Sequence, residues 1–318
     1  MSYQLVTYVK GSATTGSERA GLIIGERIYD ARAASRLAPR ADAVLWDDCH
    51  TLVANWKVQA PLLEQAARAI AAKPKALASL PRAGTRLRPP IVPRNIYFAG
   101  ANYRDHVAEM ARVLGLPQDA DPRAANPRPW HSLKATGSTL RGDGDSTANP
   151  GSPMLDWEVE LAVVIGVQAK DLALADALSC VAGYSVANDL SAREHVSRPE
   201  VAAASPFRWD WIAQKSFDGA CPFGPAITPA QAIADPMKLG LKTWVNGELM
   251  QDSNTSQMIY SVAEQIAYLS SRITLLPGDV ILTGTPAGVG MARKRFLKAG
   301  DHVKCWVEGI GELNTMIT

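Results

Sequence analysis

The clearest pattern of apolar and polar positions lies in residues 156–166, which read Asp-Trp-Glu-Val-Glu-Leu-Ala-Val-Val-Ile-Gly. Residues 161–165 are continuously apolar, which predicts a strand buried on both faces. Alternate side chains of a strand share one face about 6.5–7 Å apart, so Glu158 and Glu160 point the same way at the mouth of this strand. Two carboxylates this close repel unless a cation lies between them or one takes up a proton. The alternative is a solvated polar face on an edge strand.

A second apolar run, residues 183–191, predicts a strand that ends in polar residues at Asp189. Antiparallel pairing of the two strands would bring the carboxylates of Glu158, Glu160 and Asp189 to one point. A cluster of oxygen ligands suits Mg²⁺ or Mn²⁺ better than zinc. The chain therefore has a candidate site for a hard divalent cation.

Short strands are expected elsewhere from alternation and turn signals. They are residues 3–8, the pair 20–25 and 27–29, residues 95–100, a hairpin with an Asn-Gly turn at 241–250, a strand within 277–290, and 303–307. The strand within 277–290 runs into a glycine-rich turn. Backbone N–H groups of such a turn can bind an anion, here a carboxylate rather than a phosphate because no Gly-Lys-Ser/Thr ending is present.

Helical spacing of apolar residues is found at 41–52, 61–71, 101–110 and 261–271. In the third of these, Asn102 is expected to cap the N-terminus and Asp105 to lie in the first turn, where the helix dipole favours a carboxylate. His106 and Glu109 are i and i+3, so they share a face. Glu109 could hold the imidazole of His106 in one tautomer and make it a general base. The alternative is a surface contact without a catalytic role.

Pro, Gly, Ser, Asn and Asp are dense in residues 121–153, so most of this segment is expected to lack regular structure. A long loop flanked by candidate chemistry is expected to be a lid or binding loop, with a linker or mobile insertion as the alternative. A proline-rich stretch at 87–93 divides the chain. We therefore expect a small α/β N-terminal domain, residues 1–88, and a catalytic domain, residues 89–318.

The composition argues against several classes of function. The 318 residues carry 33 basic and 31 acidic side chains, with no basic run that could follow a phosphate backbone, so no nucleic-acid partner is expected. No apolar stretch approaches the length of about 20 residues that crosses a bilayer, and the first residues lack a signal-peptide pattern. A cytoplasmic protein without membrane association is expected. The four cysteines are scattered, which argues against a disulfide framework or a structural zinc site, and Cys180 and Cys305 are expected in the core.

Several stretches, taken in order, resemble those of the fumarylacetoacetate hydrolase family, in its branch of acylpyruvases and 2-hydroxyhepta-2,4-diene-1,7-dioate isomerases. They are Ala-Asn-Tyr-Arg-Asp-His at 101–106, Glu-Val-Glu-Leu-Ala-Val-Val-Ile-Gly at 158–166, Gly-Tyr-Ser-Val-Ala-Asn-Asp at 183–189 with Ser-Ala-Arg at 191–193, Lys-Ser-Phe-Asp at 215–218, Ser-Asn-Thr-Ser at 253–256 and Pro-Gly-Asp-Val-Ile-Leu-Thr-Gly-Thr-Pro at 277–286. Any one alone is weak evidence. Their ordered combination is strong.

The resemblance implies an α+β fold, mainly β, in which a mixed β-sandwich roll follows the small N-terminal domain, and a homodimer. It places a Mg²⁺ or Mn²⁺ ion at Glu158, Glu160 and Asp189. The remaining implied roles are those of catalytic and substrate-binding residues. They are His106 and Glu109 as a catalytic pair, Lys215 as a catalytic, substrate-contacting lysine, and Arg104, Trp130, Gln257, Gly284 and Thr285 as substrate contacts.

This chain departs from the family pattern in two places. Glu194 stands where many members carry Asp. The segment 121–153 is longer than the loop of relatives, and Trp130-His-Ser-Leu-Lys134 is the nearest counterpart of their Phe-x-Lys element, so substrate specificity is not carried over. His131 and His195 are alternative bases, although His195 is expected on a helix surface.

The resemblance implies a metal-dependent hydrolase that binds a 2-oxo acid and cleaves the C–C bond of an acylpyruvate through a pyruvate enolate, in aromatic or sugar-acid catabolism. Alternatives on the same metal site are decarboxylation of an oxaloacetate-type acid and isomerisation or hydration of a 2-hydroxydienoic acid of the homoprotocatechuate-pathway type. The His106 and Glu109 pair favours hydrolysis, because hydrolysis needs a base that activates water. A metal-stabilised protein that only binds a keto acid is the alternative of another class.

Overall fold

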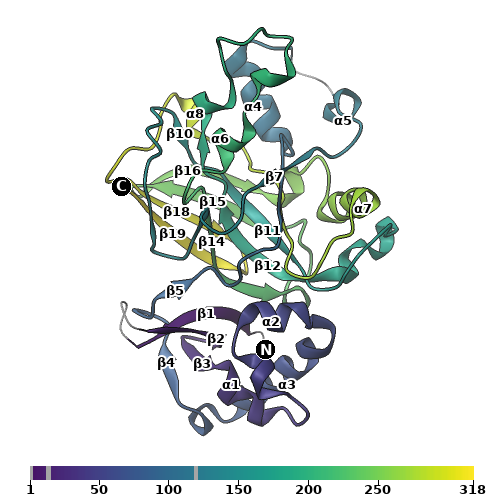
Figure 1. Cartoon of the computed structure of the whole chain (residues 1–318), viewed down its shortest axis with the longest axis vertical. Coiled ribbons are helices and arrows are strands. Elements are labelled where there is room, and N and C mark those ends of the chain that lie inside the picture. Colours follow the sequence, from purple (N-terminus) through teal and green to yellow (C-terminus); the bar gives the residue numbers. More distant parts are fainter. Residues whose placement is uncertain (1–2, 12–15, 118–120) are drawn as a thin grey trace.

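The computed structural model describes residues 3–11, 16–117 and 121–318. Two sheets and the helices around them form an α+β architecture, shown in Figure 1. Within the described ranges, no helix combines the length and the apolar character needed to cross a membrane.

The larger sheet runs from the N-terminal strands to the strands that carry the candidate site. Its main path contains, in spatial order, β4 (Ser79–Pro81), β3 (Arg27–Asp30), β2 (Ser17–Ile24), β1 (Gln4–Lys10), β14 (Cys221–Pro229), β12 (Val181–Asn188), β11 (Val159–Ile165), β17 (Val280–Leu282), β6 (Ile96–Ala99) and β7 (His131–Lys134). Two short strands join from the side, β5 (Leu87–Arg88) on β1 and β8 (Leu140–Arg141) on β14. The pair Leu5 and Ile227 links β1 to β14, so the N-terminal strands continue into the sheet of the rest of the chain. The division expected at residue 88 stays a prediction.

The second sheet has five strands and packs against one face of the first. Its order is β16 (Glu248–Asn254), β15 (Gly240–Val245), β18 (His302–Val307), β19 (Gly311–Ile317) and β9 (Ser146–Thr147). The pair β10 (Leu155–Asp156) and β13 (Ser191–Ala192) stands apart. The turn between β15 and β16 is the predicted Asn-Gly turn, and both Asn246 and Gly247 have the positive φ angles that such a hairpin turn requires.

Strand β11 is buried on both faces, as its apolar run predicts. Val159, Leu161, Val163 and Ile165 belong to the core between the two sheets. Ala162 and Val164, on the opposite face, belong to the core that also contains residues of the N-terminal helices. Alternate residues of a strand share a face, so Glu158 and Glu160 lie on the same face as Ala162 and Val164. This face points away from the core between the two sheets.

The helices differ from the expected ones mainly at their starts. They are α1 (Ala31–Ala34), α2 (Cys49–Ala54), α3 (Trp56–Ala72), α4 (Arg104–Leu114), α5 (Pro122–Ala125), α6 (Trp211–Lys215), α7 (Val262–Arg272) and α8 (Gly290–Arg293). The helical material expected at 41–52 is divided, because a 3₁₀ turn at Ala43–Trp46 precedes α2. The Asp48 side chain accepts a hydrogen bond from the Thr51 backbone N–H at 2.7 Å and so starts a new helix there.

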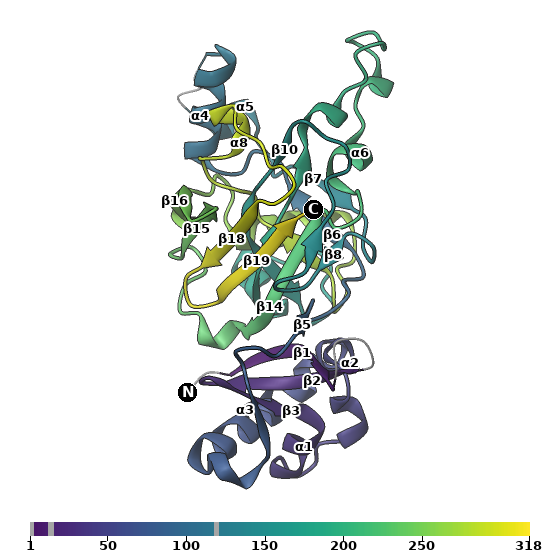
Figure 2. The ribbon, with the colours of Figure 1, turned by 90° about the vertical axis from the view of Figure 1, so that its left-hand side faces the viewer.

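Asn102 does not cap α4. Its side chain donates to the carbonyl oxygens of Tyr260 and Thr283 and accepts from the Tyr260 N–H, which ties the start of this segment to two distant parts of the chain. The residue before α4 is Tyr103, and Asp105 lies in the first turn as expected. In Figure 2, α4 and the segment around α6 stand on opposite sides of one end of the molecule.

Candidate active site

Three buried carboxylates converge where β11 begins and β12 ends. The antiparallel register pairs Val159 with Asn188, and the Asp189 N–H donates to the Glu158 carbonyl at 2.9 Å. One carboxylate oxygen each from Glu158, Glu160 and Asp189 lies within 4.8 Å of the others. The proximity expected from strand periodicity and antiparallel pairing is therefore observed.

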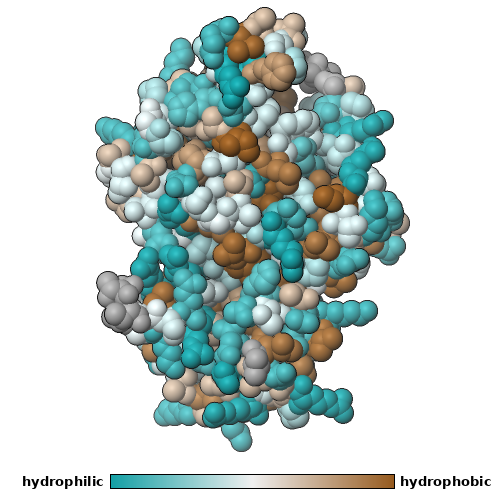
Figure 3. All heavy atoms as spheres, viewed as in Figure 1, coloured by the Kyte–Doolittle hydropathy of each residue, from teal (hydrophilic) through white to brown (hydrophobic). Residues whose placement is uncertain are grey.

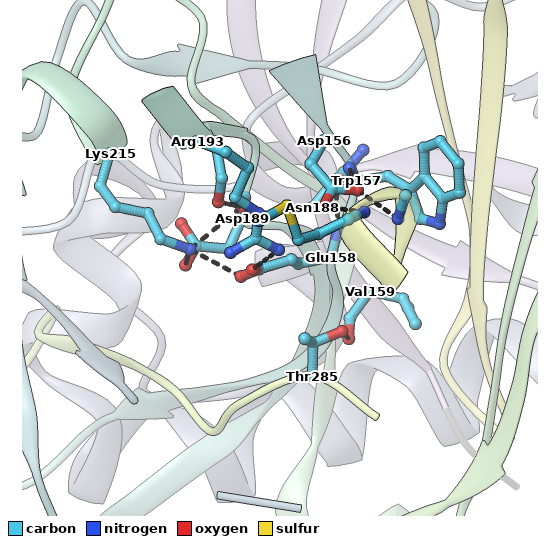
Figure 4. Close-up of polar contacts among 12 residues, drawn as sticks. Asp156, Trp157, Glu158, Val159, Asn188, Asp189, Arg193, Lys215 and Thr285 are labelled. Carbon is cyan, nitrogen blue, oxygen red and sulfur yellow. Dashed lines mark hydrogen bonds and ion pairs between the residues drawn. The ribbon is translucent and has the colours of Figure 1, made fainter. Parts of the chain in front are cut away.

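Three cations surround this cluster, as Figure 4 shows for two of them. The Lys215 ammonium Nζ lies 2.6 Å from Glu158 Oε2 and 2.5 Å from Asp189 Oδ2. Lys134 Nζ lies 2.8 Å from Asp189 Oδ1. Arg193 Nη2 lies 2.6 Å from Glu158 Oε1, and its Nε lies 2.9 Å from the Asp156 carboxylate. These side chains are all largely buried, so each ion pair is protected from solvent.

The charges divide unequally among the carboxylates. Burial raises the pKa of Glu158, but the charges of Lys215 and Arg193 outweigh it and hold that pKa below its usual range. Burial, reinforced by the charges of Asp189 and Glu158, raises the pKa of Glu160 well above its usual range. Glu160 accepts a hydrogen bond from the Gly284 N–H at 2.6 Å. In the described part of the chain no lysine or arginine forms an ion pair with Glu160.

This donor set fits a divalent cation. It offers only oxygen atoms, which Mg²⁺ and Mn²⁺ prefer, from three carboxylates close enough to share one ion. Glu160 in particular holds a buried carboxylate without a basic partner, and such a group is costly unless a cation approaches it. Glu158, Glu160 and Asp189 would hold the metal.

A cavity of about 710 Å³ opens onto this cluster. Glu158, Glu160, Arg193, Lys215 and Thr285 form its polar floor. The walls are mostly apolar, and their largest side chains are Phe98, Met110, Leu114, Trp130, Trp209 and Trp211. A ligand that reaches the carboxylates must therefore pass an apolar wall.

His106 lines the same cavity from α4. Burial lowers its pKa from 6.5 to about 4, although the Glu158 carboxylate opposes the shift. The ring is therefore neutral at neutral pH, and its buried Nδ1 has no hydrogen-bond partner. A neutral imidazole that faces a cavity can accept a proton there.

The expected pairing of Glu109 with His106 is not formed. Glu109 Oε2 instead accepts a hydrogen bond from the Gly288 N–H at 2.8 Å. His106, Met110 and Leu114 follow the i, i+4, i+8 spacing and line the cavity, whereas Glu109 faces the turn before α8. The i, i+3 spacing would allow Glu109 to contact His106, but the hydrogen bond from the Gly288 N–H takes the place of that contact.

The predicted substrate contacts divide into two groups. Trp130 and Thr285 line the cavity, and Gly284 binds Glu160 at its edge. Arg104 is exposed and donates to the Met258 carbonyl at 2.7 Å, and Gln257 is exposed in a 3₁₀ turn. These two are not among the described residues that line the cavity, so the structure does not bring them to the site.

The two alternative histidine bases lie elsewhere. Nε2 of His131 is 3.2 Å from Gln265 Oε1, and its ring stacks on Tyr268. Nε2 of His195 is 3.4 Å from Glu194 Oε1. Among the described residues, His106 is the histidine that lines the cavity.

The sequence patterns assign no role to Lys134 and Arg193. In the structure Lys134 binds Asp189, and Arg193 binds Glu158. A signal for Lys134 existed in the Trp130–Lys134 stretch, where a lysine ends a short strand-like run. Arg193 stood in the Ser-Ala-Arg run, next to the strand that leads to Asp189. Neither signal indicates which carboxylate the lysine or the arginine binds.

Comparison with known proteins agrees with this picture. The sequence model of the fumarylacetoacetate (FAA) hydrolase C-terminal domain matches residues 95–318. The mitochondrial oxaloacetate tautomerase of Rattus norvegicus is 38% identical over 80% of this chain and 78% of its own length. Fumarylacetoacetate hydrolase from Exiguobacterium antarcticum is 29% identical with a TM-score of 0.76, over 100% of this chain and 99% of that one. Maleylpyruvate hydrolase from Sphingobium sp. SYK-6, in complex with manganese(II) and pyruvate, is 29% identical with a TM-score of 0.70, over 99% of this chain and 98% of that one.

Proposed function

Because the chain belongs to the fumarylacetoacetate hydrolase family, a family of enzymes, we propose that it hydrolyses the C3–C4 bond of an acylpyruvate, a 2,4-dioxo acid. One observation carries the proposal. Two members of the buried carboxylate triad, Glu158 and Glu160, line the same cavity as a neutral histidine, His106. The volume of about 710 Å³ exceeds what pyruvate alone needs and leaves room for an acyl group.

The triad of Glu158, Glu160 and Asp189 would hold Mg²⁺ or Mn²⁺. When bound, such an ion supplies positive charge that stabilises negative charge on a substrate oxygen. The complex of the Sphingobium maleylpyruvate hydrolase with manganese(II) and pyruvate supports a metal and a 2-oxo acid at this kind of site.

His106 moves the proton in this reaction. Its neutral ring takes a proton from water while the water oxygen bonds to C4 of the substrate. The C3–C4 bond then breaks, and its electron pair passes to C3 and the C2 oxygen as the enolate of pyruvate. The proton on His106 returns to C3, which gives pyruvate and a carboxylic acid.

Other side chains of the site position groups or exclude solvent. Arg193 and Lys215 hold the Glu158 carboxylate from two sides, and Lys134 holds Asp189, so the triad keeps its geometry. The aromatic wall limits the water that reaches the floor of the cavity, which strengthens electrostatic interactions there.

A second candidate is keto–enol tautomerisation of a 2-oxo acid. The similarity to the oxaloacetate tautomerase of Rattus norvegicus supports it. The contact of Glu109 with Gly288 also supports it, because His106 then acts without a carboxylate partner and needs only to move one proton at C3. The two reactions share the enolate and differ in whether the C3–C4 bond breaks.

The test follows the ultraviolet absorbance of acetylpyruvate and other acylpyruvates together with acid release, in Mg²⁺, in Mn²⁺ and in chelator. Metal-dependent loss of absorbance with an equal amount of acid supports hydrolysis. An absorbance change without acid release supports tautomerisation. No metal-dependent change with either an acylpyruvate or oxaloacetate would overturn both.

The residues are tested in the same assay. His106→Ala is expected to lower kcat about 10²–10⁴-fold, as is usual for loss of a general base. His131→Gln is the matched control, because His131 is also largely buried with a pKa lowered to about 4 but lies outside the cavity lining. Wild-type turnover of His106→Ala would remove His106 from the mechanism.

A further inference from the structure

We infer that the substrate carries an apolar, uncharged group of about the size of an aromatic ring beyond its 2-oxo acid end, and that the cavity disfavours a second carboxylate there. The inference rests on the proposed action on 2-oxo acids. It concerns the part of the cavity that the carboxylate triad does not occupy.

The cavity separates polar from apolar groups along its depth. The charged side chains gather at the floor, where β11 begins and β12 ends. Above them the wall combines residues from four separate segments of the chain. These are Phe98 of β6, Met110 and Leu114 of α4, Trp130 before β7, and Trp209 and Trp211 at the start of α6.

The aromatic residues of the wall hold one another in place. The ring centroids of Trp130 and Trp211 are 5.2 Å apart, and that of Phe98 is 5.9 Å from Trp130 and 6.3 Å from Trp211. A Cβ atom on Gly100 would lie 2.5 Å from the Trp130 indole, so the glycine lets the ring rest on the backbone. Trp130 and Trp211 nonetheless remain 38% and 37% exposed. Rings that are fixed but uncovered offer a surface on which another ring can stack.

The wall and the floor are continuous. The Lys215 ammonium, which binds the carboxylates, also lies 5.5 Å from the centre of the Phe98 ring. An acid bound at the floor would therefore extend directly onto the aromatic surface. Figure 3 shows apolar residues gathered on the outer face around α6 and β7, so the apolar character continues to the rim.

The described lining of the cavity offers no free cation to a second carboxylate. Among the described residues that line the cavity, the basic ones are Arg193 and Lys215. Both already bind buried carboxylates. A carboxylate against the apolar wall would lose water without gaining an ion pair, which is costly, because the other polar side chains of the lining supply no positive charge and include the neutral amides of Asn126 and Gln214 and the neutral His106. An apolar ring at the same place would gain burial and aromatic contacts.

A binding measurement tests this without depending on turnover. The two probes are 2-oxo-4-phenylbutanoate and 2-oxoglutarate, which share the 2-oxo acid and two methylenes and differ in a terminal phenyl or carboxylate. Calorimetric titration of the Mg²⁺-loaded protein is expected to give a Kd at least tenfold lower for the phenyl compound. Equal affinities, or tighter 2-oxoglutarate, would overturn the inference.

Two variants locate the effect. Leu114→Lys places a cation at the rim and is expected to improve 2-oxoglutarate binding at least fivefold. Leu116→Lys is its matched control, because Leu116 is similarly exposed and only two residues further along the chain but does not line the cavity. Trp211→Ala is expected to weaken the phenyl ligand about tenfold and 2-oxoglutarate less than twofold. A uniform loss for both ligands would overturn the role of the wall.

The outcomes separate this inference from the proposed reaction. Preferential phenyl binding without cleavage of any acylpyruvate would keep the ligand class and overturn hydrolysis. Cleavage of acylpyruvates with no preference for an apolar end would support hydrolysis and overturn the inferred ligand class. Failure of both probes to bind with metal present would overturn the action on 2-oxo acids and the inference with it.

Discussion

The substitution Glu160→Gln tests whether the carboxylate triad is built for a cation. Glu160 is buried, and its carboxylate accepts one hydrogen bond from the Gly284 N–H. Glutamine has nearly the same shape and keeps an oxygen that can accept this bond. The substitution therefore removes the capacity for a negative charge and little else, and the raised pKa of Glu160 shows that burial and the charges of Asp189 and Glu158 make this charge unfavourable without a metal.

The size of the effect follows from the geometry. At the largest separation in the triad, 4.8 Å, two unit charges repel by about 3 kcal/mol at an effective dielectric constant of about 20. Lys215 offsets part of this repulsion, so the variant in chelator should match the stability of the wild type or exceed it by about 1–3 kcal/mol. A metal at 100 times its Kd would stabilise the wild type by about 2.7 kcal/mol. The variant lacks one charged ligand and should gain less than about 1 kcal/mol under the same conditions.

The assay is urea denaturation of both proteins in chelator and in excess Mn²⁺. We expect Mn²⁺ to stabilise the wild type by about 2 kcal/mol more than the variant, whichever protein is the more stable in chelator. Glu248→Gln, which changes an exposed glutamate outside the cavity lining, should change the free energy of unfolding by the same amount in chelator and in Mn²⁺. The reasoning fails if Glu160→Gln is the less stable protein in chelator, or if Mn²⁺ stabilises both proteins by the same amount.

Three further predictions concern groups around the site and the core. Lys134→Met should lower the free energy of unfolding in chelator by about 1–3 kcal/mol, measured by urea denaturation, because the buried Asp189 loses one charged partner and keeps Lys215; an unchanged free energy of unfolding would contradict it. Burial lowers the pKa of His131 from 6.5 to about 4, so the unfolded chain binds more protons in this interval and stability falls as pH drops through it. His131→Gln should make that fall less steep, measured as unfolding free energy between pH 7 and about 4. Gly288→Ala should lower Tm more than Gly25→Ala, because both have positive φ but only at Gly288 would the new Cβ lie 2.1 Å from a backbone oxygen.

The position of the triad was predictable because it depends on local rules. Strand periodicity places Glu158 and Glu160 on one face, and the β11–β12 pairing that brings Asp189 to them joins two neighbouring apolar runs of the chain. The same rules predicted the β15–β16 hairpin and the two-sided burial of β11.

The parts that the sequence did not reveal depend on contacts between distant segments. Lys134 reaches Asp189 because β7 pairs with β6 and β6 pairs with β17, a path that no local pattern defines. Asn102 is a sound N-cap candidate by residue type, yet its side chain bonds to Tyr260 and Thr283. For Glu109, helical spacing indicates which neighbours are within reach but not that the Gly288 N–H competes for the same oxygen.

The placement of floor and wall on different kinds of structure has an evolutionary consequence. The triad sits on paired strands whose apolar residues form two cores, so a substitution there risks the whole fold. Apart from Phe98 of β6, the wall comes from α4, the stretch before β7 and the start of α6, whose side chains are more exposed, so substitutions there are expected to disturb the fold less. Mutation can therefore redesign the acyl side of the cavity while the acid-binding end stays constant. Related enzymes can in this way come to accept different organic acids while they keep the same catalytic groups.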